Sequence, residues 1–80
     1  MESEPGQWPI DRAMDNYVTS ADARELYGLY RPAIAALRVA AAQRLRVNGK
    51  RSRDHATALI SRADDLERAA IRDMSAASSE

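Results

Sequence analysis

The fold is decided by one short stretch of the chain, Val47-Asn48-Gly49-Lys50-Arg51-Ser52, which separates two long segments with a helical pattern. Asn48 and Gly49 are typical of residues that follow a helix, because glycine adopts the left-handed conformation at no steric cost. Ser52 is a common cap, so we expect it to begin the next helix. Two helices of about 25 residues joined by so short a turn fold back on each other as an antiparallel hairpin.

Both segments repeat apolar residues at intervals of three and four, which is typical of amphipathic helices. The seam before the turn, in a helix that runs to about residue 47, consists of Tyr27, Tyr30, Ile34, Leu37, Ala41 and Leu45, widened by Leu26 and Leu29. The seam after it, in a helix that runs to about residue 75, consists of Ala56, Leu59, Ala63, Leu66, Ala70 and Met74, with Ile60 and Ile71 on its shoulder. Because proline removes a helical hydrogen bond, Pro32 predicts a kink or a short break near residues 28–31, or two helices that meet at an angle.

A shorter amphipathic helix is predicted over residues 9–17. Pro9 suits the first helical position, where its missing N–H has no partner to lose. The apolar stripe of this helix consists of Ile10, Ala13, Met14, Tyr17 and Val18. Thr19 and Ser20 then offer caps for the next helix, and Thr19 with Asp22 three residues later fits the reciprocal capping pattern.

The predicted fold is therefore all-α, an antiparallel helical hairpin with a short N-terminal helix packed on it. Residues 9–75 form one helical domain, and the polar residues 1–8 and 76–80 are expected to be mobile tails. The 80 residues include 16 alanines but only 6 Leu, 4 Ile and 3 Val, and no Phe. Because alanine seams bury little area, a chain of this size needs further cover. We expect a homodimer that completes a bundle, or a complex with another protein.

The net charge of zero hides a segregated pattern. Residues 1–30 carry six acids and two bases, residues 31–53 carry seven bases and no acid, and residues 54–80 carry six acids and three bases. The hairpin brings five of the bases to its tip: Arg44, Arg46, Lys50, Arg51 and Arg53. Cations beside the free N–H groups at the start of a helix suit a phosphate or a carboxylate. An exposed, solvated turn explains the same residues, and so does docking onto an acidic protein surface.

The four aromatic residues, Trp8, Tyr17, Tyr27 and Tyr30, all precede the basic segment. We expect Tyr17 and Tyr30 to lie in the core, with the short helix folded onto the base of the hairpin. Trp8 borders the tail and is the aromatic residue that we expect to contact a partner, since Trp dominates interface hot spots. Stacking of bases at the tip is not expected, because no aromatic residue follows Tyr30.

The sequence offers no chemistry typical of an enzyme. There is no cysteine and only one histidine, His55, so no metal or cofactor is expected, and no small-molecule substrate. Asp64, Asp65 and Glu67 form a tight acidic cluster, but Arg68 follows at helical spacing, which favours a solvated face. Arg38 is expected near this cluster from the register of the hairpin. No signal sequence or membrane span is apparent, which predicts a cytoplasmic protein without membrane contact. Eleven arginines against one lysine indicate a GC-rich genome, such as that of a bacterium or its phage.

By elimination, the sequence predicts a small non-enzymatic protein–protein interaction module that acts as a regulator, adaptor or inhibitor of a larger partner. Its predicted contact residues are Trp8 and the five bases of the tip. The alternative is a nucleic-acid-binding protein that uses the same basic tip.

Overall fold

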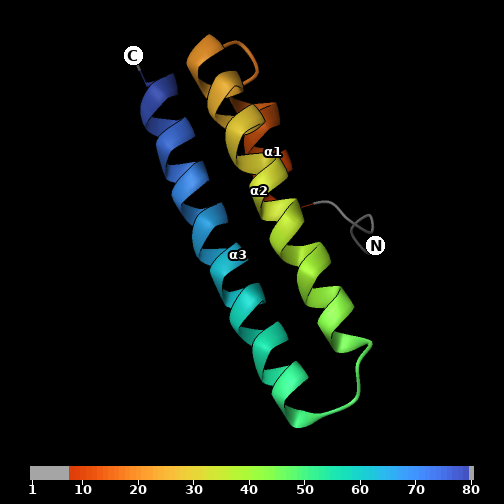
Figure 1. Ribbon diagram of the computed structural model, residues 1–80. Helices are drawn as coiled ribbons and strands as arrows, with labels where there is room; N and C mark the ends of the chain where they lie inside the picture. Colours follow the sequence, from red (N-terminus) through yellow and green to blue (C-terminus); the bar gives the residue numbers. More distant parts are fainter. Residues whose placement is uncertain (1–7, 80) are drawn as a thin grey trace, which may run out of the picture.

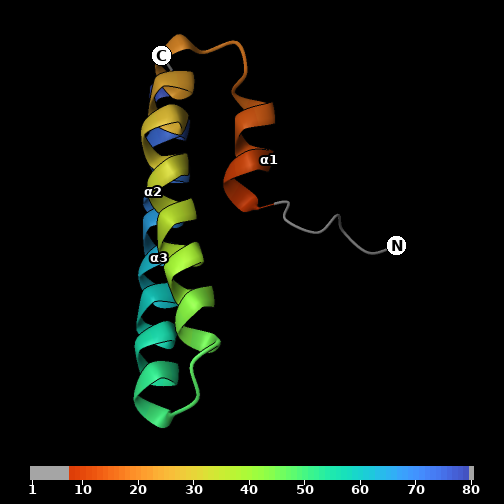
Figure 2. The ribbon, with the colours of Figure 1, turned by 45° about the vertical axis from the view of Figure 1, so that its right-hand side comes forward.

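The computed structural model describes residues 8–79 and contains three helices, α1 (Pro9–Asn16), α2 (Ala21–Leu45) and α3 (Lys50–Ser78). α2 and α3 lie side by side in opposite directions along their whole length (Figure 1). α1 lies against both of them in the half of the hairpin where α2 begins and α3 ends (Figure 2). The predicted all-α hairpin with a short N-terminal helix is confirmed. Residues 1–7 of the predicted N-terminal tail and Glu80 lie outside the described residues.

Local signals set the start of α1 and α2. Trp8 is extended at the N-cap of α1 and Pro9 takes the first helical position, as its fixed φ favours. The cap of α2 differs from the reciprocal pattern expected at Thr19. The hydroxyl of Ser20 accepts a hydrogen bond from the Ala23 N–H at 3.1 Å. The turn that follows α1 closes through a hydrogen bond from the Ser20 N–H to the Tyr17 carbonyl, which leaves Thr19 exposed one residue too early to cap.

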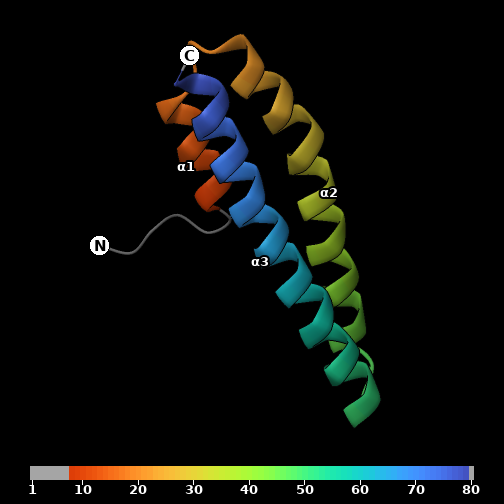
Figure 3. The same cartoon turned by 90° about the vertical axis from the view of Figure 1, so that its left-hand side faces the viewer.

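Of the outcomes expected near residues 28–31, the break and the pair of separate helices are wrong, because α2 continues as a single helix through Gly28 and Pro32 (Figure 3), and the kink stays a prediction. Proline removes one hydrogen bond there. Both Gly28 and Pro32 face solvent, so water can reach the carbonyl that the proline leaves without a partner. Tyr27, Tyr30 and Ile34 pack into the core on either side of Pro32. This packing holds the helix together, as tertiary burial stabilises most helices in proteins.

The start and the end of α3 also differ from expectation. Gly49, with φ +135°, is the N-cap, and its carbonyl accepts a hydrogen bond from the Arg53 N–H. Ser52, the expected cap, lies half-buried inside the first turn. At the other end the helix runs to Ser78, so part of the predicted C-terminal tail is helical.

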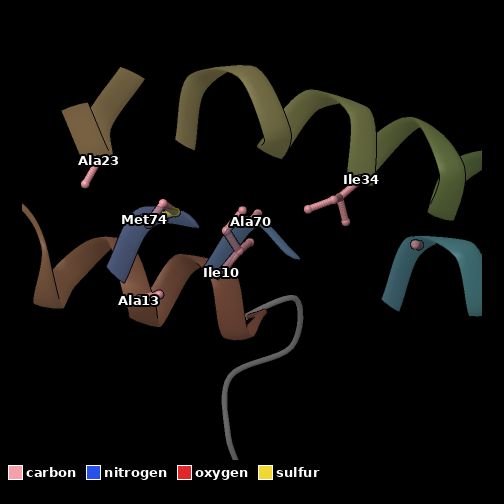
Figure 4. Close-up of a cluster of buried hydrophobic side chains, with 7 residues drawn as sticks. Ile10, Ala13, Ala23, Ile34, Ala70 and Met74 are labelled. Carbon is pink, nitrogen blue, oxygen red and sulfur yellow. The ribbon is translucent and has the colours of Figure 1, made fainter. Parts of the chain in front are cut away.

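The core is small and rich in alanine. The buried residues of its main cluster come from all three helices and are Ile10, Ala13, Ala23, Ile34, Ala63, Ala70 and Met74 (Figure 4). Ile10, Ile34 and Met74 are the largest fully buried side chains of the described residues. Tyr17 and Tyr30 pack against this cluster, as predicted. Two residues placed in the seam of α2 are instead exposed, Leu45 near the turn and Leu29 on the far side of the helix.

Candidate functional site

The five bases predicted at the turn lie together at one end of the hairpin, and we call them the basic tip: Arg44, Arg46, Lys50, Arg51 and Arg53. All five are exposed, as is His55 beside them. Within residues 8–79, Lys50 is the one base of the tip that forms an ion pair, with Asp54 at 3.2 Å on the open surface. α3 starts without a side-chain cap and without an acid in its first turn. The basic tip therefore presents cations and helix N–H groups to solvent.

The second notable site is a buried carboxylate, which the sequence analysis missed. Glu67 of α3 is only 4% exposed. Its Oε2 accepts a hydrogen bond from the Ile10 N–H of α1 at 3.1 Å, and its Oε1 accepts one from Arg38 Nη2 of α2 at 3.0 Å. Glu67 thus joins all three helices. The expected solvated face is wrong for this residue and holds for Asp65, which is exposed and pairs with Arg68.

Arg38 balances the charge of Glu67. Its Nη2 also donates to Asp64 at 2.8 Å, so the predicted proximity of Arg38 to the acidic cluster is confirmed. Burial alone would lower the pKa of Arg38, but the hydrogen bonds to Glu67 and Asp64 outweigh it and raise this pKa above its usual value. The other guanidinium nitrogen, Nη1, is buried without a hydrogen-bond partner among the described residues.

Trp8 and Asp11 complete the attachment of α1. The Trp8 ring centre lies 3.7 Å from Cζ of Arg31 and 4.4 Å from Cζ of Arg38, within the range of cation–π attraction. Arg31 Nε donates to Asp11 Oδ1 at 2.9 Å, and the Tyr27 hydroxyl donates to the same oxygen at 2.8 Å. Burial would raise the pKa of Asp11, but these two hydrogen bonds lower it below its ordinary value.

We call this set of residues the α1 clamp: Trp8, Asp11, Tyr27, Arg31, Arg38 and Glu67. The half-buried Trp8 has a structural role within the clamp, and its predicted contact with a partner remains a prediction. The clamp faces α1, whereas a separate hydrogen bond from the Tyr30 hydroxyl to Asp73, at 2.8 Å, joins α2 and α3 directly. The pKa of Tyr30 is raised by this bond.

A third site is an uncharged face of α2 that no helix covers, and we call it the outer face: Leu29, Pro32, Ala33, Ala36, Val39 and Ala40. Leu29 is 66% exposed and Val39 is 57% exposed. Ala33, Ala36 and Pro32 are exposed and Ala40 partly so. The sequence does contain a pattern that could have revealed the outer face, because these residues also recur at intervals of three and four. Leu29 was predicted in the inner seam because α2 carries apolar residues on two sides.

Residues 8–79 enclose no pocket, and they bring no three His, Cys, Asp or Glu side chains close enough together to hold a metal ion. None of the described helices has the length and apolar character needed to span a bilayer. No protein family, curated protein or solved structure matches this chain.

Proposed function

We propose that this protein is a non-enzymatic interaction module that regulates, adapts or inhibits a larger partner through the outer face of α2. The observation that carries this proposal is the exposure of Leu29 and Val39 on one uncharged helix face. Single exposed apolar residues are ordinary, but a row of them along one helix is typical of a docking surface. Helices commonly bind partners through apolar residues spaced in this way.

The rest of the fold supports this proposal because it holds α2 firmly. α3 packs along the length of α2, and the α1 clamp fixes Tyr27, Arg31 and Arg38 on a second side. A partner therefore meets a helix that is already ordered, and binding carries little further entropic cost. The small core also favours a protein that gains stability from what it binds.

Affinity capture with the tagged chain tests the proposal. Val39→Lys places a charge in the middle of the outer face, and we expect it to release a partner that the native chain retains. Val18→Lys is the matched control, because Val18 is 49% exposed but lies in the turn before α2. Equal retention by both variants and the native chain contradicts binding through this face.

The basic tip supports a second candidate function, the binding of nucleic acid. Five exposed bases lie there beside a helix start that has no side-chain cap, and phosphate is the anion that such clusters most often bind. No aromatic residue lies in the described chain after Tyr30, so contact would be with phosphates and would carry no sequence preference.

Fluorescence anisotropy of labelled DNA and RNA, at low and at physiological salt, tests this second function. The double variant Arg51→Glu with Arg53→Glu is expected to weaken binding of all sequences alike and to flatten its salt dependence. Arg12→Glu with Arg62→Glu changes the net charge equally, at two exposed positions away from the tip. Equal binding by the two double variants, or no binding by the native chain at low salt, contradicts a nucleic-acid site at the tip.

A further inference from the structure

We infer that the occupant of the outer face is a second copy of the chain, packed antiparallel to the first about a twofold axis that passes between the two α2 helices. The inference rests on the proposed function, because it names the protein that the outer face binds. It depends on the spacing of the outer face and on the charges at its two ends.

The outer face has the spacing of a helix–helix seam. Leu29, Pro32, Ala36 and Val39 follow one another at intervals of three and four, and Gln43 extends the row. A repeat that averages 3.5 residues keeps one stripe of a helix against a partner helix over several turns. α3 and α1 already occupy other sides of α2, so this stripe is a second seam without a partner among the described residues (Figure 2).

Charged residues close the row at both ends. Asp22 and Glu25 continue it toward the start of α2, and Arg46 continues it beyond the end of the helix, with Arg44 beside it. All four side chains are exposed. Within residues 8–79 none of the four forms an ion pair. The row is therefore acidic at one end, apolar in the middle and basic at the other end.

Such a row is complementary to itself only when one copy is reversed. An antiparallel pair places Asp22 of each copy opposite Arg46 of the other, and Glu25 opposite Gln43 with Arg44 adjacent. The same register places Leu29 opposite Val39, and Pro32 opposite Ala36, on both sides of the twofold axis. A parallel pair would place acid beside acid and base beside base, which is repulsive.

The packing at the centre of this pair is also favourable. Ala33 lies nearest the axis, followed by Pro32 and Ala36 at equal distance along the helix, and the small alanine side chains allow two helices to approach closely. In an antiparallel pair the macrodipoles of the two α2 helices point in opposite directions, which is favourable. The same orientation brings the basic end of each helix to the acidic end of the other. The product is a bundle with the two α2 helices inside and α1 and α3 of each copy outside, and in a twofold assembly the same surface of both copies forms the contact.

Sedimentation equilibrium of the native chain over a range of concentrations tests the inference. We expect a species of twice the 8.8 kDa chain mass that dissociates on dilution. Val39→Lys is expected to sediment as the single chain with unchanged helix content, because Val39 is exposed within each copy. Val18→Lys is expected to remain a dimer. A native chain that stays at 8.8 kDa, or a dimer that Val39→Lys leaves intact, overturns the inference.

Charge reversal tests the orientation of the pair. Asp22→Arg alone and Arg46→Asp alone are each expected to raise the dimer dissociation constant by about tenfold, since each turns two attractive pairs into repulsive ones. The double variant exchanges the signs and is expected to return to within about threefold of the native value. Singles without effect, or a double variant weaker than both singles, overturn the antiparallel arrangement.

These results separate the inference from the proposed function. A chain that stays monomeric, but whose capture of another protein depends on Val39, overturns self-association and leaves the interaction module standing. A dimer that depends on Val39, with no other protein retained by either form, supports the inference and removes the regulatory role.

Discussion

Glu67 shows how much of this small fold depends on one side chain. A carboxylate that is only 4% exposed costs free energy to bury unless hydrogen bonds and an opposite charge compensate it. Here one oxygen accepts from a backbone N–H of α1 and the other accepts from Arg38 of α2. The backbone N–H of Ile10 is among those at the start of α1 that lack an intrahelical acceptor. Glu67 therefore supplies a cap for α1 from a distant helix.

Glu67→Ala is predicted to lower the free energy of unfolding by about 2–4 kcal/mol, since it leaves a buried N–H and a largely buried guanidinium with unmet hydrogen bonds. Urea unfolding followed by circular dichroism measures this loss. The matched control is Asp65→Ala, two residues earlier on the same helix, where an exposed ion pair contributes at most about 1 kcal/mol. Similar losses in both variants would show that Glu67 does not hold α1 in place.

Asp11 makes the stability of the fold depend on pH in the acidic range. Its pKa is lowered in the folded chain, because the hydrogen bonds from Tyr27 and Arg31 outweigh the effect of burial. A lowered pKa contributes stability above the unfolded value of 3.8, and this contribution is lost as the pH falls through the folded value. Thermal unfolding between pH 6 and pH 2 should therefore show a smaller acid destabilisation in Asp11→Asn than in the native chain. Asp15→Asn, an exposed change on the same helix, should leave the native profile unaltered.

At the scale of the helices, the predicted number, order and pairing of the helices are confirmed, whereas local chemistry located their ends only in part. Pro9 begins α1 as predicted, but Gly49 is the N-cap of α3 where Ser52 was expected, and Ser20 caps α2 where the reciprocal pattern pointed to Thr19. The break at Pro32 was wrong because packing on both sides of the proline outweighs the loss of one hydrogen bond. Glu67 and the outer face were missed for a related reason. Periodicity shows that a helix has an apolar and a polar face. The positions of α1 and α3 decide which polar residue is covered and which apolar row is left exposed.

Replacement by alanine is predicted to have opposite effects on stability at two glycines, Gly28 inside α2 and Gly49 directly before α3. Gly28 lies inside α2 without positive φ and with no atom within 4 Å of an added Cβ, so Gly28→Ala is expected to stabilise the chain by about 0.5–1 kcal/mol. Gly49 has φ +135°, which an alanine adopts only with strain, so Gly49→Ala is expected to destabilise it by about 1–3 kcal/mol. Urea unfolding of both variants measures the two changes. Stabilisation by both would mean that the turn relaxes to another conformation.

The whole molecule has no net charge, but its acidic and basic residues are separated along its length. The basic tip gathers five of the twelve bases at one end, while the acids of α1 and of the start of α2 lie toward the other (Figure 1). Two such molecules attract each other best when reversed. This arrangement favours the antiparallel pair inferred from the outer face, and it leaves the basic tips of the two copies at opposite ends of the assembly, exposed to a further partner.

A chain whose core contains few large side chains should owe part of its stability to this pairing. If the dimer is the folded form, unfolding is coupled to dissociation and the melting temperature rises with protein concentration. A hundredfold increase in concentration contributes about 2.7 kcal/mol per dimer, which is expected to raise the Tm by about 5–10 °C in a domain of this size. Circular dichroism melts of the native chain and of Val18→Lys should show this rise, and Val39→Lys should melt at one temperature throughout. A native Tm that does not depend on concentration would mean that the alanine-rich core suffices alone, and that the outer face contributes nothing to the stability of the fold.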